Sequence, residues 1–218
     1  MTNQEILASL QDLAEKDGKY REFIARVVKD ETVDYLGVRV PDLRKLVREI
    51  AQGDWREFLI NNTWRTHEEK MLTMMLPKYI RPKLVASELF SYFDEVLPHL
   101  SSWAQTDTLA TKYTQIQASQ TESYRVILDY IISDEPWTVR FGLILLQENF
   151  LNDEFIDGVL ILVKNIETGE YYIKMAAAWL LATAAIKYRD KVEWALDNVD
   201  AEIAKFARQK MRDSRRVS

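Results

Sequence analysis

The stretch Ser101-Ser102-Trp103-Ala104-Gln105-Thr106-Asp107 opens an amphipathic segment with an aromatic residue, and openings of this kind recur along the chain. The aromatic residues concerned are separated by 39, 34 and 35 residues: Trp64, Trp103, Trp137 and Tyr172. A nearly constant period of this length is typical of two-helix repeats that stack on one another. The spacing therefore predicts one structural unit that is repeated with a varied aromatic edge.

The remaining segments also have a helical pattern. Apolar residues recur three and four positions apart in the first two segments, at Ile6, Leu7, Leu10, Leu13, Phe23, Ile24, Val27 and Val28. This pattern indicates one buried stripe on each helix. No stretch alternates between apolar and polar residues as a strand would. We therefore expect an all-α fold of helices of about ten to sixteen residues, paired as antiparallel hairpins.

Proline and short polar residues predict where several helices begin and end. Pro41 suits the first turn of a helix that runs to about Ile50, and Pro77 should end or kink the helix expected over 67–80. Short polar side chains that accept hydrogen bonds from a first helical turn are candidate N-caps. The candidates are Asp54, Ser101 or Ser102, Asp134, Asp153 and Asp200.

Composition excludes several classes of protein. With 218 residues, of which 47% are hydrophobic, the chain can form a single repeat domain over residues 1–218. The absence of Cys excludes disulfides and thiolate-bound zinc, and two His residues leave little for a transition-metal site, so we expect no metal and no cofactor. No apolar run could span a bilayer, and Met1-Thr2-Asn3-Gln4-Glu5 does not resemble a secretion signal. We expect a cytoplasmic protein, and a monomer.

The charges are unevenly distributed. The net charge of −5 argues against a uniformly basic nucleic-acid binder, although only the local field at a binding face matters for phosphate contact. Near the end of the chain one acid, Asp213, stands among six cations: Lys205, Arg208, Lys210, Arg212, Arg215 and Arg216. These cations could complement the dipole of a solvated terminal helix, or they could contact phosphate. Both interpretations remain open.

Trp103 and Asp107 are the pair with the clearest chemical potential. Four residues apart on a helix, they share a face, so an indole and a carboxylate would project side by side toward a cation. A Trp at a helix start is more often a core anchor, and Asp107 could instead form a salt bridge to Lys112 or Arg140. A carboxylate is expensive to bury without a partner, which favours an exposed site.

Two residues further along belong to the same hypothesis. Arg140 is the lone cation of an apolar helix, so it should pair with an acid or meet an anion. Trp179 lies among small residues, where packing and a surface platform are equally reasonable roles. In stacked helix pairs the second helices line one wall, which predicts that Trp103, Asp107, Arg140 and Trp179 converge on a concave surface.

Other motifs favour structural roles or are missing. The run His67-Glu68-Glu69-Lys70 lacks the second His that a zincin motif requires, and we interpret it as a capped, charged helix start. Met71, Met74 and Met75 are predicted to fill the core. No glycine-rich phosphate loop or serine elbow is present, which argues against nucleotide-driven and serine-hydrolase chemistry.

Several motifs, taken in order, resemble a known family. They are Leu36-Gly37-Val38-Arg39-Val40-Pro41-Asp42-Leu43-Arg44, His67-Glu68-Glu69-Lys70, Trp103 with Asp107, Trp137-Thr138-Val139-Arg140, and the segment from Tyr171 to Trp179. Their order and spacing, from about residue 20 to the end, resemble those of the bacterial AlkD-like DNA alkylation repair proteins. The resemblance implies a HEAT-like helical-repeat solenoid and a DNA glycosylase that releases cationic N3- or N7-alkylated purines from double-stranded DNA.

The resemblance also implies roles for individual residues. It identifies Trp103, Asp107 and Trp179 as catalytic cleft residues, Arg140 as a cation near the DNA backbone and Tyr171 as an aromatic flanking the lesion. Lys112 and Lys174 complete the predicted DNA contacts. The chemistry suits these residues, because a cationic purine leaves without a general acid, whereas the oxocarbenium-like sugar needs a nearby carboxylate.

A second function stays open beside the first. A non-catalytic helical-repeat module could bind DNA or a protein partner through the same concave wall. Asp107 beside Trp103 favours the glycosylase. The acidic net charge, and the apolar Val139 and Leu180 where active relatives tend to carry arginine, favour the binding module.

Overall fold

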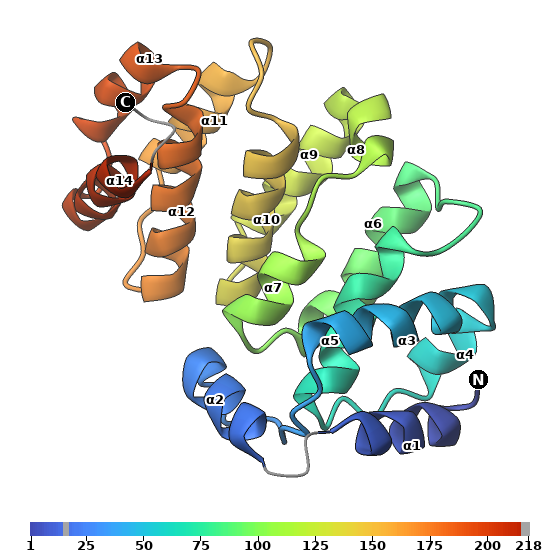
Figure 1. The fold of residues 1–218 in the computed structure, drawn as a ribbon. Coiled ribbons are helices and arrows are strands. Elements are labelled where there is room, and N and C mark those ends of the chain that lie inside the picture. The colour runs from blue at the N-terminus through green and yellow to red at the C-terminus, as the bar shows by residue number, and fades with distance from the viewer. Residues whose placement is uncertain (15–17, 215–218) are drawn as a thin grey trace. The chain divides into compact units, whose positions relative to one another are not determined.

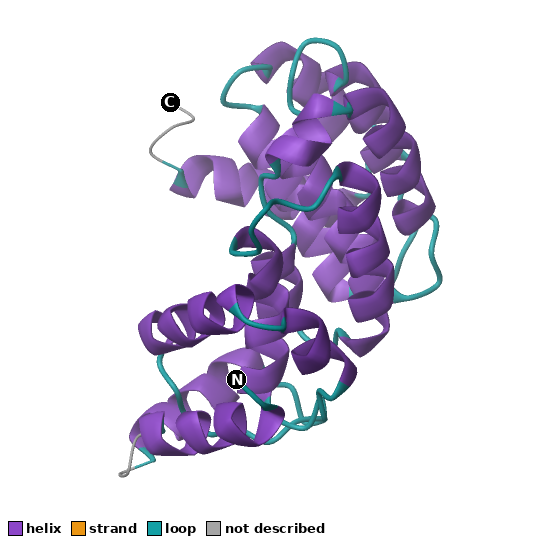
Figure 2. Ribbon diagram, turned by 90° about the vertical axis from the view of Figure 1, so that its right-hand side faces the viewer, coloured by secondary structure: helices purple, strands orange, loops and turns teal. Residues whose placement is uncertain are grey.

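The computed structural model describes residues 1–14 and 18–214, and within these ranges it consists of helices and loops without a strand (Figures 1 and 2). One isolated bridge joins Asp34 to Thr66. The helices of the described residues are α1 (Asn3–Leu13), α2 (Lys19–Val28), α3 (Val40–Gln52), α4 (Trp55–Ile60), α5 (His67–Met75), η1 (Leu76–Lys78), α6 (Ala86–Val96), η2 (Leu97–His99), α7 (Trp103–Leu109), α8 (Thr114–Ala118), α9 (Gln120–Ile131), α10 (Pro136–Asn149), α11 (Ile156–Lys164), α12 (Tyr171–Ala184), α13 (Arg189–Leu196) and α14 (Ala201–Asp213).

The chain divides into two compact units, Met1–Leu109 and Ala110–Ser218. In the first unit α5 packs against both α3 and α7, so these alternate helices form one layer. In the second unit α12 packs in the same way against both α10 and α14, and α11 packs against α13. This arrangement confirms the predicted all-α fold of successive helix pairs. That residues 1–218 form one repeat domain stays a prediction.

Several helix boundaries agree with the sequence. Pro41 lies in the first turn of α3, and α5 ends at Met75 because Pro77 cannot continue it. Asp54 and Asp200 cap α4 and α14 through their side chains. Within the part of the chain that the structure describes, eight helices have the expected length of ten to sixteen residues: α1, α2, α3, α6, α9, α10, α12 and α14. The shorter α-helices of the described residues are α4, α5, α7, α8, α11 and α13.

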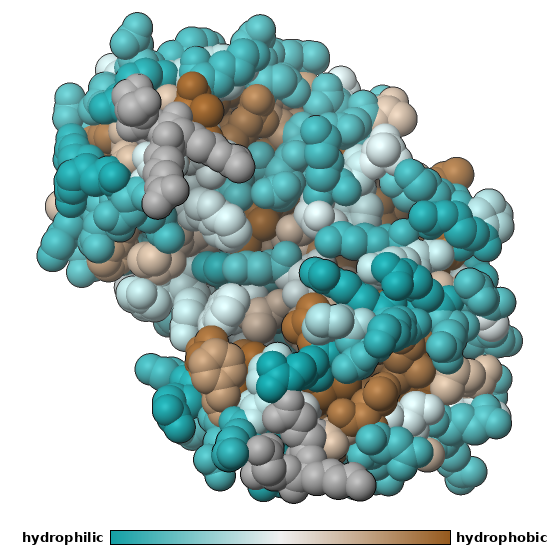
Figure 3. Space-filling model, viewed as in Figure 1, coloured by the Kyte–Doolittle hydropathy of each residue, from teal (hydrophilic) through white to brown (hydrophobic). Residues whose placement is uncertain are grey.

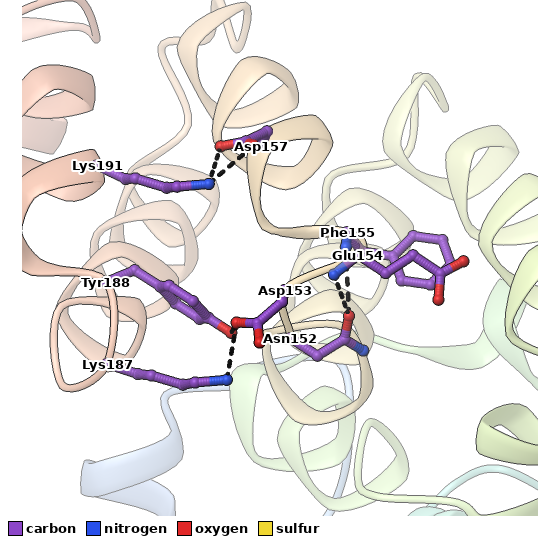
Figure 4. Close-up of polar contacts among 8 residues, drawn as sticks. All are labelled: Asn152, Asp153, Glu154, Phe155, Asp157, Lys187, Tyr188 and Lys191. Atoms are coloured by element: carbon purple, nitrogen blue, oxygen red, sulfur yellow. Dashed lines mark hydrogen bonds and ion pairs between the residues drawn. The ribbon is translucent and has the colours of Figure 1, made fainter.

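Two predicted N-caps are wrong. Helix α10 begins at Pro136 after Glu135, and α11 begins at Ile156 after Phe155, so neither Asp134 nor Asp153 occupies the cap position. Asn152 binds the backbone N–H groups of Glu154 and Phe155 instead (Figure 4). Asp153 is thereby left to accept hydrogen bonds from side chains of the next helix pair.

The contacts between successive helix pairs repeat with the period of the sequence. Asp153 accepts hydrogen bonds from Lys187 and Tyr188, and Lys191 pairs with Asp157, so two of these contacts span 34 residues (Figure 4). Aromatic rings pack across similar separations in both units: Tyr35 on His67, Trp64 on His99, Trp137 on Tyr172 and Tyr171 on Phe206. These ring contacts therefore connect consecutive repeats within each unit. Trp64 itself lies before α5, with φ of 58°, rather than in its first turn.

The core is aliphatic and aromatic. Met71, Met74 and Met75 are buried, as predicted, and Ile6, Leu10 and Val28 line the buried sides of α1 and α2. The stripes predicted for α1 and α2 are wrong in part, because Leu13 is 41%, Phe23 53% and Val27 41% exposed. The face shown in Figure 3 is mainly hydrophilic, with separate apolar areas. Among the described residues, no helix is both long and apolar enough to cross a membrane.

Candidate functional site

Helix α7 presents Trp103 and Asp107 on its partly exposed side. The helix begins at Trp103, and both residues are half-buried, whereas Gln105, Thr106 and Leu109 are buried. A spacing of four residues is just over one helical turn, so the indole and the carboxylate lie one above the other. The arrangement can offer an aromatic ring and a negative charge to one ligand.

A polar cluster, buried except for the half-buried Ser101, holds the start of α7. We call it the α7 network, and it consists of Asp30, Lys70, Ser101 and Gln105. Ser101 Oγ donates to Asp30 Oδ2 and accepts a hydrogen bond of 2.7 Å from Lys70 Nζ. Gln105 Nε2 donates to the same Asp30 oxygen at 3.1 Å, and Gln105 Oε1 accepts the Ser101 backbone N–H at 2.9 Å.

Electrostatics in the α7 network follow from burial and pairing. Burial opposes ionisation of Asp30, but hydrogen bonds from Ser101 and Thr32 and the charge of Lys70 outweigh it, so the pKa of Asp30 is lowered. Burial also lowers the pKa of Lys70, an effect that Asp30 partly offsets. A buried pair of this kind costs little only while both partners remain in place.

The loop before α3 is held by a carboxylate from α5. Glu68 is 1% exposed and accepts hydrogen bonds from the backbone N–H groups of Leu36, Gly37 and Val38, at 2.8 to 3.2 Å. Gly37 has a φ of 90°, a backbone conformation that residues with a side chain rarely adopt. The motif Leu36-Gly37-Val38 and the acidic run at 67–70 are therefore in direct contact, although they lie about 30 residues apart in the sequence. Leu36, Gly37 and Val38 belong to the same connection between α2 and α3 as Asp30.

The acidic run is a capped helix start, as predicted, but it is not a solvated one. Thr66 and Glu69 form a reciprocal capping box, and all four residues from His67 to Lys70 are buried. His67 stacks on Tyr35, and burial is the main cause that lowers the pKa of its imidazole. Within the described residues, no group of three potential ligands that could hold a metal ion is present.

In the second unit, Arg140 joins α10 to α12. Its guanidinium is buried, and Nη1 donates a hydrogen bond of 2.8 Å to the backbone carbonyl of Tyr172. Trp137 packs on the ring of Tyr172 with centroids 5.0 Å apart. Arg140 is therefore fixed at the start of α12, the helix that also carries Tyr171 and Trp179.

Helix α12 presents two aromatic rings and a paired lysine. Trp179 is 38% and Tyr171 55% exposed, while Ala176, Ala177 and Ala178 are buried. Lys174 Nζ pairs with Glu202 and lies 3.7 Å from Asp200, on α14 and its cap. The hydrogen bond to Glu202 is the main cause that raises the pKa of the Lys174 ammonium. Lys174 therefore adds less charge to the surface than the exposed Lys112.

The predicted site residues fall into both units. Trp103 and Asp107 belong to the first unit, and Lys112, Arg140, Tyr171, Lys174 and Trp179 belong to the second. That they converge on one surface stays a prediction. Sequence reasoning missed the α7 network, since only its long-range partners distinguish Asp30 and Ser101 from ordinary loop residues.

The cations near the end of the chain extend along α14. Lys210 and Arg212 lie in its last turn, where they complement the helix dipole, and Arg208 pairs with Asp197. Arg215 and Arg216, which the sequence placed in the same group, lie outside the described residues. The alternative interpretation, that this segment contacts phosphate, remains a hypothesis.

These features define the class of protein as an all-α helical repeat with aromatic side chains along its helix starts. The sequence model of the family described as DNA alkylation repair enzyme matches residues 6–216, and the chain belongs to that family. Its architecture of helix pairs is consistent with the predicted HEAT-like repeat fold. A comparison with curated proteins found no match.

Proposed function

We propose that the protein is a DNA glycosylase that hydrolyses the N-glycosidic bond of cationic N3- or N7-alkylated purines in duplex DNA. Membership of a family of DNA alkylation repair enzymes supports the substrate class. The observation that carries the proposal is the pairing of Trp103 and Asp107 on the partly exposed side of α7. A carboxylate beside an indole suits a substrate that carries a positive charge.

The proposed reaction needs a carboxylate but no general acid. An alkylated purine is already cationic, so it departs as a neutral base when the bond to the sugar breaks. The sugar then develops oxocarbenium character, which the Asp107 carboxylate would stabilise electrostatically. Asp107 would also orient the water that attacks the sugar. His67 is buried, stacks on Tyr35 and takes no part in this scheme.

The aromatic and basic residues would bind the damaged nucleotide. The indoles of Trp103 and Trp179 would each contribute about 0.5–2 kcal/mol of cation–π attraction, depending on desolvation. Tyr171 would flank the lesion. Lys112, which is exposed, would contact the DNA backbone, where charged side chains position the duplex without reading its sequence. Arg140 and Lys174 would reach phosphate only when DNA binding releases them from the Tyr172 carbonyl and from Glu202.

Release of N7-methylguanine and N3-methyladenine from methylated duplex DNA tests the proposal. We expect release under single-turnover conditions, with a rate that falls about 100-fold in Asp107→Asn, because the charge is lost while the shape is kept. Asp129→Asn, which changes an exposed carboxylate on α9, is the matched control and should leave the rate unchanged. Trp179→Leu should slow release, whereas Trp194→Leu, at an exposed tryptophan on α13, should not.

A second candidate is a non-catalytic module that binds DNA or a protein partner. The net charge of −5 and the apolar Val139 and Leu180 favour it. Equally slow base release by the wild type and Asp107→Asn, with DNA binding retained in both, would establish the DNA-binding module. No DNA binding even at low salt, where phosphate contacts are strongest, would leave the protein scaffold.

A further inference from the structure

We infer that the α7 network is a positioning device: Asp30, Lys70, Ser101 and Gln105 set the rotation of α7 about its axis and thereby aim Trp103 and Asp107. The inference rests on the proposed function for its kinetic consequence. Its structural part, the orientation of α7, can be tested without it.

The α7 network joins three separate parts of the first unit. Asp30 follows α2, Lys70 lies in the first turn of α5, and Ser101 and Gln105 flank the start of α7. The hydrogen bonds from Asp30 to Ser101 and to Gln105 span 71 and 75 residues. Helix α7 is only 7 residues long, so two side-chain contacts at its first turn constrain a large part of it.

Helix geometry connects the buried contact to the exposed pair. Successive residues of an α-helix are rotated by about 100°, so Trp103 and Asp107 both point roughly 160° away from Gln105. The burial agrees with this geometry, because Gln105 is completely buried whereas the other two are half-buried. Fixing Gln105 against Asp30 therefore turns the indole and the carboxylate outward.

Ser101 is the centre of the α7 network. Its hydroxyl donates to Asp30 and accepts from Lys70, so it uses both of its hydrogen-bonding functions between two opposite charges. Without this hydroxyl, Lys70 would lose its hydrogen bond to α7, and Asp30 would hold the helix through Gln105 alone. Thr32 binds the other Asp30 oxygen through its backbone N–H and its hydroxyl, which fixes the carboxylate itself.

The neighbouring Ser102 provides a matched control. It is 1% exposed, whereas Ser101 is half-buried, yet its hydroxyl has no hydrogen-bond partner among the described residues. Ser101→Ala and Ser102→Ala thus remove the same group from adjacent positions, and only the first breaks the α7 network. Ser101→Thr keeps the hydroxyl and should restore the wild-type behaviour. Gln105→Met serves as a second disrupting variant should Ser101→Ala fail to fold.

The experiment combines fluorine NMR with kinetics on the full chain. With 5-fluorotryptophan incorporated, and the Trp103 signal assigned from Trp103→Phe, we expect Ser101→Ala to shift the Trp103 resonance and leave that of Trp194 in place. The single-turnover rate of base release should fall at least about tenfold per folded molecule, since small misplacements of catalytic groups are costly. Ser102→Ala should change neither quantity, and Ser101→Thr should restore both.

The two readouts separate the inference from the proposed function. If Ser101→Ala, or Gln105→Met in its place, leaves the Trp103 resonance where Ser102→Ala leaves it, the inference is overturned. If the resonance shifts but the wild type releases no base, the positioning of α7 is supported and the glycosylase proposal fails. A shifted resonance with an unchanged rate in an active enzyme would also overturn the inference.

Discussion

Glu68 Oε1 accepts the backbone N–H of Gly37 at 2.8 Å, so a buried carboxylate of α5 holds the loop of the preceding repeat. The same side chain binds the N–H groups of Leu36 and Val38. Backbone donors buried without a partner are costly, and this carboxylate satisfies three in succession. Glu68 therefore links two sequence motifs that lie about one repeat apart.

Removing this carboxylate should destabilise the fold strongly. We expect Glu68→Ala to lower the free energy of unfolding by about 3 kcal/mol, because charge-assisted hydrogen bonds are lost and buried N–H groups are left without acceptors. Urea denaturation measures the change. Glu95→Gln, at an exposed position of α6, should alter it by less than about 0.5 kcal/mol. Equal effects of the two substitutions would contradict the structural role of Glu68.

Gly37 should tolerate no side chain. An added Cβ would lie 2.9 Å from Cβ of Arg21, and the residue has φ of 90°. We expect Gly37→Ala to cost about 1–3 kcal/mol through backbone strain and this contact. Gly169→Ala is the control, since no heavy atom of the described residues would lie within 4 Å of a Cβ added there. Thermal unfolding of both variants checks the prediction, and a Gly37→Ala protein that unfolds at the same temperature as Gly169→Ala would disprove it.

Asp30 should make the stability depend on pH in the acid range. Burial raises its pKa, but hydrogen bonds from Ser101 and Thr32 and the charge of Lys70 lower it by more, so the folded-state pKa lies below the ordinary value. The stabilisation is therefore complete above the unfolded pKa of about 3.9 and is lost as the pH falls through the lower folded value.

The difference in unfolding free energy between the wild type and Asp30→Asn should thus shrink as the pH is lowered from about 7 to about 3. Urea titrations at each pH measure it. Asp129→Asn, on the surface of α9, should give a small difference that stays nearly constant. A constant difference for Asp30→Asn would mean that its carboxylate does not titrate in this way.

Lys112 should contribute to DNA affinity through phosphate contact. Each such contact releases a counterion, so Lys112→Gln should reduce the slope of log affinity against log salt concentration by about one. The comparison is the same substitution at Lys191, Lys191→Gln, because the Lys191 ammonium pairs with Asp157 where α11 packs against α13. Fluorescence anisotropy with labelled duplex DNA measures both slopes, and equal slopes for Lys112→Gln and the wild type would remove Lys112 from the binding surface.

Much of the fold follows from local patterns. The three- and four-residue spacing of apolar side chains indicates helices, and Pro41 and Pro77 mark a start and an end. Asp153 shows where local reasoning fails. An aspartate before a helix is a reasonable cap, but the cap position of α11 is Phe155, and Asp153 binds Lys187 and Tyr188 of the next repeat.

The candidate site divides in the same way. Trp103 and Asp107 can be paired from their spacing alone, because four residues in a helix define a common face. The surroundings of Lys112 and Lys174 cannot be read in this way. Lys112 is exposed, whereas Lys174 pairs with Glu202, and the residues beside each lysine in the sequence do not reveal this difference.

The helices, the repeat period, the family and the pair on α7 can be inferred from the order of residues alone, since each is encoded in residues that lie close together or in a recurring order. The burial of Glu68, Lys70 and Asp30, and the hydrogen bonds by which Ser101 and Gln105 hold α7, follow from the packing of the helices and not from any local pattern. The partners of these groups lie 30 to 75 residues away, and stacking of the helix pairs brings them together. A charged side chain carries no local signal that tells a solvated position from a paired one, because its environment is made by other repeats.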